Sequence, residues 1–216
     1  MLDDGAKDVV RLGMALLASI AALVLSLLIN SSYGVYEGQR SDLRTLAADV
    51  INLDNTLRLY GEEARPTRVL LRQGVIEAVE HLWSRPSLNM FAMQGSSGEK
   101  AYLMLLDLVP RDEKQATLKA LALQISNQIA QSRLRLFERS EPDLPMSLLV
   151  ILAAWMVCLF LSFCLFSPLK PTSIVALLLV ALSISAALFL ILELSEPFSG
   201  LVRLSDHPLT GALPAL

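Results

Sequence analysis

Charged residues are scarce in this sequence, and their scarcity is the first guide to the class of protein. Asp, Glu, Lys and Arg make up 18% of the 216 residues, whereas about a quarter is usual in a soluble globular domain. The formal net charge is −3, so no basic field points to a nucleic-acid partner. Because the chain is also 54% hydrophobic, we predict a protein that places much of its length in a lipid bilayer.

Residues that hold metals or perform nucleophilic catalysis are equally few. The two histidines, His81 and His207, are far apart in the sequence, and no cysteine or histidine cluster has the spacing of a zinc site. Cys158 and Cys164 are six residues apart in an apolar run, so they fall on different faces of a helix and no disulfide is expected. The sequence contains no phosphate loop, dinucleotide fingerprint or nucleophile elbow. We therefore predict no enzymatic activity, no metal site and no cofactor.

Three uninterrupted apolar runs are each predicted to cross the membrane as one helix. They cover residues 12–30, 146–166 and 173–194, and each can span about 30 Å of hydrocarbon at 1.5 Å per residue. The first run is too long for a signal peptide and lacks a small-residue cleavage site. The short connector 167–172 holds two prolines, so the second and third runs should form an antiparallel hairpin. Residues 1–11 and 195–216 are then a polar N-terminal flank and a C-terminal tail.

The middle region, residues 31–145, is polar enough to be exposed to water and has the pattern of helices. Its first helix should continue directly from the first span, because a heptad series of apolar side chains follows and Gly61 favours a stop. The members of that series are Tyr36, Leu43, Leu46, Val50, Leu53, Leu57 and Tyr60. Further helices are predicted at about 67–83, 99–109 and 112–139, with a loop at 84–98. The predicted fold class is all-α, with long stalk helices continuous with the spans.

Small side chains mark a face of the first span that can pack closely. Ala18, Ala22 and Ser26 lie four residues apart, a spacing that suits tight helix contact in lipid. Two interpretations stay open for this row. It can serve packing between helices of one chain, or it can form a subunit interface or line a pore.

Basic residues indicate which side of the membrane holds the middle region. Six arginines would lie on its side of the membrane, against Lys7, Arg11 and Lys170 on the opposite side. The six are Arg40, Arg44, Arg133, Arg135, Arg139 and Arg203. Since basic residues accumulate on the cytoplasmic side, we predict that the middle region is cytoplasmic.

A second group of arginines lies within the middle region itself. Arg65, Arg68 and Arg72 are roughly one helical turn apart. We interpret them as a solvated basic face, with binding of anionic lipid or other anions as the alternative.

The end of the third run carries a motif that resembles a known family. Glu193 and Leu194, followed by Pro197, Phe198 and Gly200, match the Glu-Leu-x-x-Pro-Phe-x-Gly element of the bacterial bestrophin-like domain family. Its members are membrane proteins of largely unknown function. Earlier segments agree with the resemblance, which covers nearly the whole chain: residues 7–13, 53–54 and 59–64, then Arg68 and Trp83.

The resemblance implies a location and a function as well as a fold. Bestrophins are pentameric anion channels with an acidic calcium clasp, so it implies a homo-oligomer in the bacterial inner membrane that passes small anions. The acidic clasp is missing beside Pro197 and Phe198, and no hydrophobic neck motif is evident. Family members usually have one more span before the segment with which this chain begins, which would give four. The alternative function is a non-conducting membrane scaffold, interaction or sensor protein with a helical-bundle domain.

Overall fold

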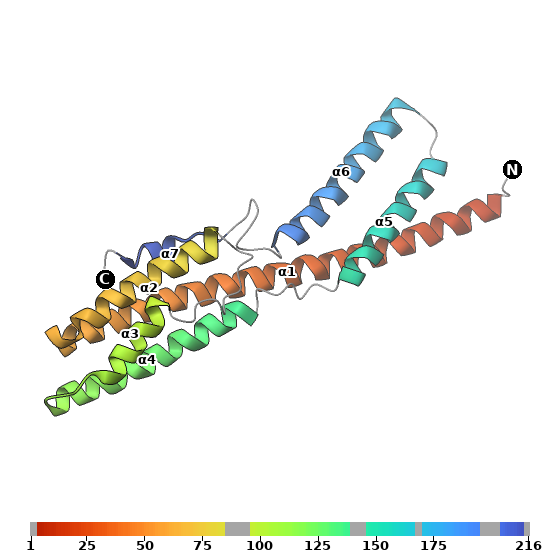
Figure 1. The fold of residues 1–216 in the computed structure, drawn as a ribbon. Helices are drawn as coiled ribbons and strands as arrows, with labels where there is room; N and C mark the ends of the chain where they lie inside the picture. Colours follow the sequence, from red (N-terminus) through yellow and green to blue (C-terminus); the bar gives the residue numbers. More distant parts are fainter. Residues whose placement is uncertain (1–3, 85–95, 139–145, 167–169, 195–203, 214–216) are drawn as a thin grey trace. The chain divides into compact units, whose positions relative to one another are not determined.

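The structure is all-helical in every part that it describes. The computed structural model describes residues 4–84, 96–138, 146–166, 170–194 and 204–213, and these contain helices and no strand (Figure 1). The all-α prediction is therefore confirmed for them. Within these described ranges, three helices are long and apolar enough to cross a membrane. The chain divides into two compact units, one made of residues 1–36 and 142–195 and the other of residues 37–141 and 196–216.

The longest helix, α1 (Asp4–Tyr60), runs without interruption from the first apolar run through the heptad series. It ends at the predicted stop, because Gly61 has a φ of 127°, a conformation that residues with a Cβ rarely adopt. From Leu43 to Tyr60 the predicted seam is buried. Tyr36 is only half-buried, and Gln39, three residues on, is fully buried in the same stripe.

The first unit contains the apolar part of α1 together with α5 (Met146–Phe166) and α6 (Pro171–Leu194) (Figure 1). Helix α5 has the bounds predicted for the second run, and α6 begins two residues before the predicted start of the third run. Proline at the first helical position explains the earlier start, since its missing N–H has no partner there in any case. The buried core joins all three helices through Ala21, Leu28, Leu152, Leu159 and Ile191.

The second unit contains the end of α1 and the remaining elements. These are η1 (Glu62–Ala64), α2 (Arg65–Ser84), α3 (Ser97–Asp107), α4 (Glu113–Glu138) and α7 (His207–Thr210). The bounds of α2, α3 and α4 lie within two residues of the prediction. Helix α4 begins one residue late because Asp112 caps it, with its Oδ1 2.6 Å from the backbone nitrogen of Gln115.

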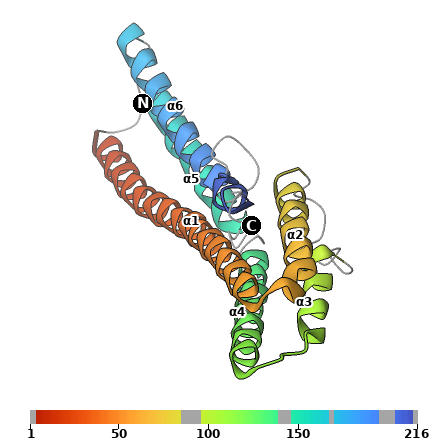
Figure 2. The ribbon, with the colours of Figure 1, turned by 90° about the vertical axis from the view of Figure 1, so that its left-hand side faces the viewer.

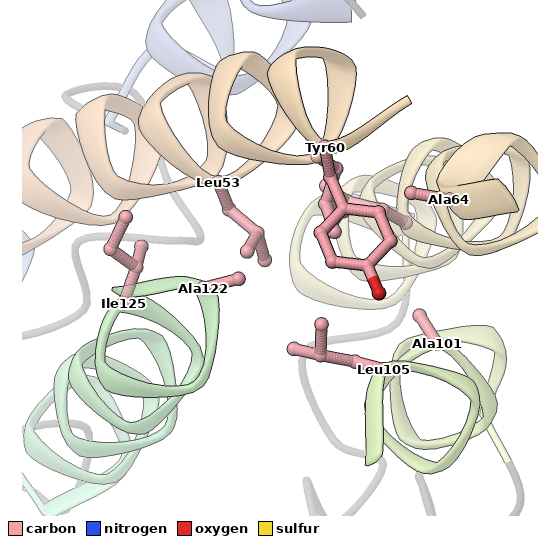
Figure 3. Packing of buried hydrophobic residues seen from close by; sticks show 9 residues of the cluster. Leu53, Tyr60, Ala64, Ala101, Leu105, Ala122 and Ile125 are labelled. Carbon is pink, nitrogen blue, oxygen red and sulfur yellow. The ribbon is translucent and has the colours of Figure 1, made fainter. Parts of the chain in front are cut away.

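Two apolar cores hold the second unit together. In the first core, Leu53 of α1 points toward Ala122 and Ile125 of α4, and the Tyr60 ring points toward Leu105 of α3 (Figure 3). In the second core, the α1 seam from Leu43 to Val50 meets α2, α4 and the C-terminal segment. From Leu43 to Tyr60, the predicted seam of α1 is thus buried in two cores to which α2, α3 and α4 also contribute.

Helices α2 and α3 lie side by side (Figure 2). A Cβ added to Gly74 of α2 would be 2.8 Å from the backbone nitrogen of Gly98 in α3. The two backbones can approach this closely because Gly74 has no side chain. The C-terminal segment is tied to α2 as well, because the Trp83 Nε1–H donates to the carbonyl oxygen of Leu204 at 2.8 Å.

Candidate functional site

The small-residue row of α1 lies beside the buried face of the first unit and only partly within it. Ala21 is fully buried among residues of α5 and α6. Ala18 is half-buried and packs against the same core, whereas Ala22 and Ser26 are exposed. The described helices of the same chain therefore cover the start of the row and leave its later two members open.

Large apolar side chains surround this row. Leu12, Leu16, Leu23 and Leu27 are each 65–73% exposed, as expected for side chains that contact lipid or another apolar surface. The hydroxyl of Ser19 donates to the carbonyl oxygen of Ala15 at 2.9 Å. A hydroxyl satisfied within its own helix costs little in hydrocarbon.

The C-terminal motif is described in part. Glu193 lies in the last turn of α6 and is half-buried. The remaining motif residues Pro197, Phe198 and Gly200 lie outside the described residues. No group of three or more His, Cys, Asp or Glu side chains within the described ranges could hold a metal ion.

The prediction that Arg65, Arg68 and Arg72 form a solvated face is wrong for Arg68. Arg68 donates to both carboxylate oxygens of Asp54, with Nε–Oδ1 at 2.6 Å and Nη2–Oδ2 at 2.8 Å. The Asp54 side chain is 2% exposed and that of Arg68 is 25% exposed. The hydrogen bond to Asp54 raises the pKa of Arg68 above its ordinary value, so the pair is ionic and joins α1 to α2. Arg65 and Arg72 are exposed, as predicted.

A second polar contact fixes the start of α3 against α2. The Glu77 carboxylate accepts hydrogen bonds from the Ser97 hydroxyl at 2.6 Å and from the Ser97 backbone N–H at 3.0 Å. These bonds lower the pKa of Glu77 below its ordinary value, the hydroxyl contributing most. A carboxylate at a helix N-terminus also meets the positive end of the helix dipole.

The second unit also contains a partly open cavity of about 530 Å³ that the sequence did not predict. Its wall comes from four helices and includes Leu57 of α1, Thr67 of α2, Gly98 of α3 and Arg133 of α4. Sequence patterns missed this cavity because each helix contributes only a few of its positions, and those positions also look like ordinary core or surface residues.

Comparison with known proteins gives a consistent result. The family model described as Bestrophin-like domain matches residues 1–209. Crystal structures of a bacterial Bestrophin homolog from Klebsiella pneumoniae are similar in fold. A single-substitution variant has a TM-score of 0.74 at 18% identity, covering 94% of this chain and 85% of that one. A structure obtained by Zn-SAD phasing has a TM-score of 0.69 at 18% identity, covering 94% and 82%. No curated protein matches this chain by sequence.

Proposed function

Because the chain belongs to the bestrophin-like domain family, we propose that it forms a homo-oligomeric membrane channel for small anions and is not an enzyme. A location in a membrane is supported by its three long apolar helices and by its membership of this family. The proposal adds three things to that: assembly of several copies, conduction, and selectivity for anions.

The proposal rests mainly on the small-residue row of α1, which helices α5 and α6 of the same chain cover only in part. Ala22 and Ser26 are exposed, while neighbouring Ala21 is fully buried by α5 and α6. A closed ring of copies would bring this row of each α1 toward a shared axis or toward the next copy. Small and hydroxyl-bearing side chains leave room for a water-filled path, which large leucines would fill.

We place the middle region, residues 31–145, in the cytoplasm of a bacterium whose inner membrane holds the spans. The support is the excess of arginines on that side, Arg40, Arg44, Arg133, Arg135, Arg139 and Arg203, against Lys7, Arg11 and Lys170. Reporter fusions at about Ser97 test this orientation. Activity of a cytoplasmic reporter is expected, and activity of a periplasmic reporter would contradict it.

Conduction is tested with purified protein in liposomes loaded with chloride. Oligomeric state is first measured by mass in mild detergent, and a monomer or dimer would count against a ring-shaped pore. Chloride release from vesicles that contain the folded oligomer is the expected result. Sealed vesicles with a verified oligomer would contradict conduction and favour the non-conducting scaffold or sensor with a helical-bundle domain.

A further inference from the structure

The part of α1 that belongs to the second unit has an exposed face opposite its buried seam. The seam from Leu43 to Tyr60 contacts the two apolar cores. The side chains on the other side of the helix are exposed, and their steps of three, four and seven residues keep them on one face. They are Ser41, Arg44, Ala48 and Asn55. The described helices of the second unit therefore leave this face of α1 uncovered.

Arg44 carries a charge on this face that no carboxylate balances. Residues 37–60 of α1 contain four carboxylates, and each of them interacts with an arginine other than Arg44. The pairs are Glu37 with Arg40 at 3.4 Å, Asp42 with Arg135 at 3.8 Å, Asp49 with Arg135, and Asp54 with Arg68 at 2.6 Å. Among the described residues, Arg44 takes part in none of the ion pairs.

A second arginine adds to the positive charge of the same face. Arg58 is exposed and donates to the neutral side-chain oxygen of Asn55 at 3.3 Å. Since Glu37 and Arg40 offset each other, Arg44 and Arg58 leave the exposed face of α1 with a net positive charge.

Arg44 also lies on the side of α1 that carries the exposed end of the small-residue row. Helix α1 is uninterrupted from Asp4 to Tyr60, and Ser26 and Arg44 are 18 residues apart. At 3.6 residues per turn this is about five full turns, or about 27 Å along the helix axis. A path that follows the exposed face from Ser26 therefore leaves the apolar run and reaches Arg44 in the region that water can enter.

We propose that Arg44 sets the charge selectivity of the ion path, because one Arg44 from each copy contributes to a ring of positive charge around it. This inference rests on the proposed channel and names the residue that makes it prefer anions. Rings of charged side chains select ions by the sign of their charge. The Debye length is about 8 Å at physiological ionic strength, so the ring acts on ions that pass close to it and its effect weakens at high salt.

Reagents of opposite charge test this role on one and the same protein. Arg44→Cys is made in the full chain with Cys158 and Cys164 replaced by alanine, and the reversal potential is measured across a potassium chloride gradient. Loss of the arginine should lower the chloride-to-potassium permeability ratio at least about threefold, since a unit charge about 6 Å from an ion in water changes its occupancy by roughly that factor.

Chemical modification should then restore or reverse the charge. A trimethylammonium methanethiosulfonate reagent should return the permeability ratio toward that of the native protein, and a sulfonate reagent should lower it further. Because the same oligomers are measured before and after the reaction, a defect in folding or assembly cannot produce shifts of opposite sign. Arg72→Cys, at an exposed arginine of α2, is the matched control, and neither reagent should move its reversal potential.

The outcomes separate this inference from the proposed function. A channel that stays anion-selective in Arg44→Cys, with the same reversal potential after both verified modifications, would contradict the role of Arg44 and leave the channel standing. Failure of either reagent to react there would show that Arg44 does not face the water-filled path, and would contradict it too. Absence of current from the native oligomer would instead contradict the channel, and the role of Arg44 with it.

Discussion

At the scale of single residues, the buried ion pair of Asp54 and Arg68 is the most informative feature of the second unit. The sequence showed three arginines at helical spacing but not which one faces inward. That choice depends on the phase of α2 relative to Asp54, 14 residues earlier on another helix. A bidentate pair with one fully buried carboxylate fixes this phase, because leaving either charge without the other is costly.

Asp54→Asn should therefore lower the free energy of unfolding by about 3 kcal/mol, because it leaves Arg68 largely buried without its counter-charge. Urea unfolding of the full chain in detergent, followed by tryptophan fluorescence, measures the loss. The exposed pair of Arg65 and Glu62, 3.6 Å apart, supplies the control. Arg65→Gln should change the stability by no more than about 0.5 kcal/mol, and equal losses in the two variants would refute a structural role for Asp54.

The Glu77 carboxylate predicts a pH dependence of stability. Its pKa is lowered in the folded protein from an ordinary value of 4.5 by the hydrogen bonds from Ser97. A depressed pKa means that the contact stabilises the fold fully above pH 4.5 and that this contribution is lost as the pH falls toward the lower folded value. The melting temperature of Glu77→Gln should thus be below that of the native protein at pH 7 and approach it on acidification.

Asp49 should change the stability with pH in the opposite direction, so it serves as the control for Glu77. Burial raises the pKa of Asp49 in the folded protein, and Arg135 offsets that only in part. Its ionised form therefore weakens the fold above its ordinary pKa of 3.8. Asp49→Asn should raise the melting temperature at pH 7, and the gain should vanish on acidification. A constant difference at every pH, for either variant, would contradict these assignments.

At the scale of elements, hydrophobic periodicity predicted where the helices lie in the sequence. It did not predict the close backbone contact between α2 and α3. The seam from Leu43 to Tyr60 and the stop at Gly61 follow from local rules of spacing and backbone conformation. The close approach of α2 to α3 does not follow from such local rules. In the sequence, Gly74 looks like a glycine that weakens a helix and Gly98 like a loop glycine, and only the folded backbones show that the two are in contact. Helix α7 was missed for a similar reason, since its short apolar segment is stabilised by the second core through Leu209.

Two glycine substitutions test the contact between α2 and α3. Gly74→Ala should cost about 1–3 kcal/mol, because its Cβ would lie 2.8 Å from the backbone nitrogen of Gly98 and force the helices apart. Gly34→Ala in α1 meets nothing within 4 Å, so it should stabilise the helix by up to about 1 kcal/mol. Thermal unfolding of both variants measures the contrast. A gain in stability for Gly74→Ala would show that α2 and α3 are not in backbone contact.

At the scale of the whole molecule, the row of small residues on α1 connects the single chain to the proposed channel. The sequence identified the row by spacing but could not tell which members other helices of the chain cover. That depends on the rotation of α1 against α5 and α6, which buries Ala21 and Leu28 and leaves Ala22 and Ser26 exposed. Whether the exposed members line a pore is a property of the assembly.

Cysteine accessibility tests that property directly in the assembled protein. With Cys158 and Cys164 replaced by alanine, Ser26→Cys should react with a small, water-soluble, anionic methanethiosulfonate reagent, and the reaction should reduce chloride flux. Leu28→Cys, at a position that is 6% exposed within the core of the first unit, should neither react nor change the flux. Reaction at Leu28 with no reaction at Ser26 would show that α1 presents a different face to water.

The central claim, that copies of this chain form an anion-selective channel, is tested most directly by a reversal potential. Purified oligomer is inserted into a planar bilayer that separates two concentrations of potassium chloride, and the voltage of zero current is measured. An anion channel moves this voltage toward the equilibrium potential of chloride, and replacing chloride by a large organic anion abolishes the current. A reversal potential at the potassium equilibrium potential, or no current from a verified oligomer, would contradict the claim.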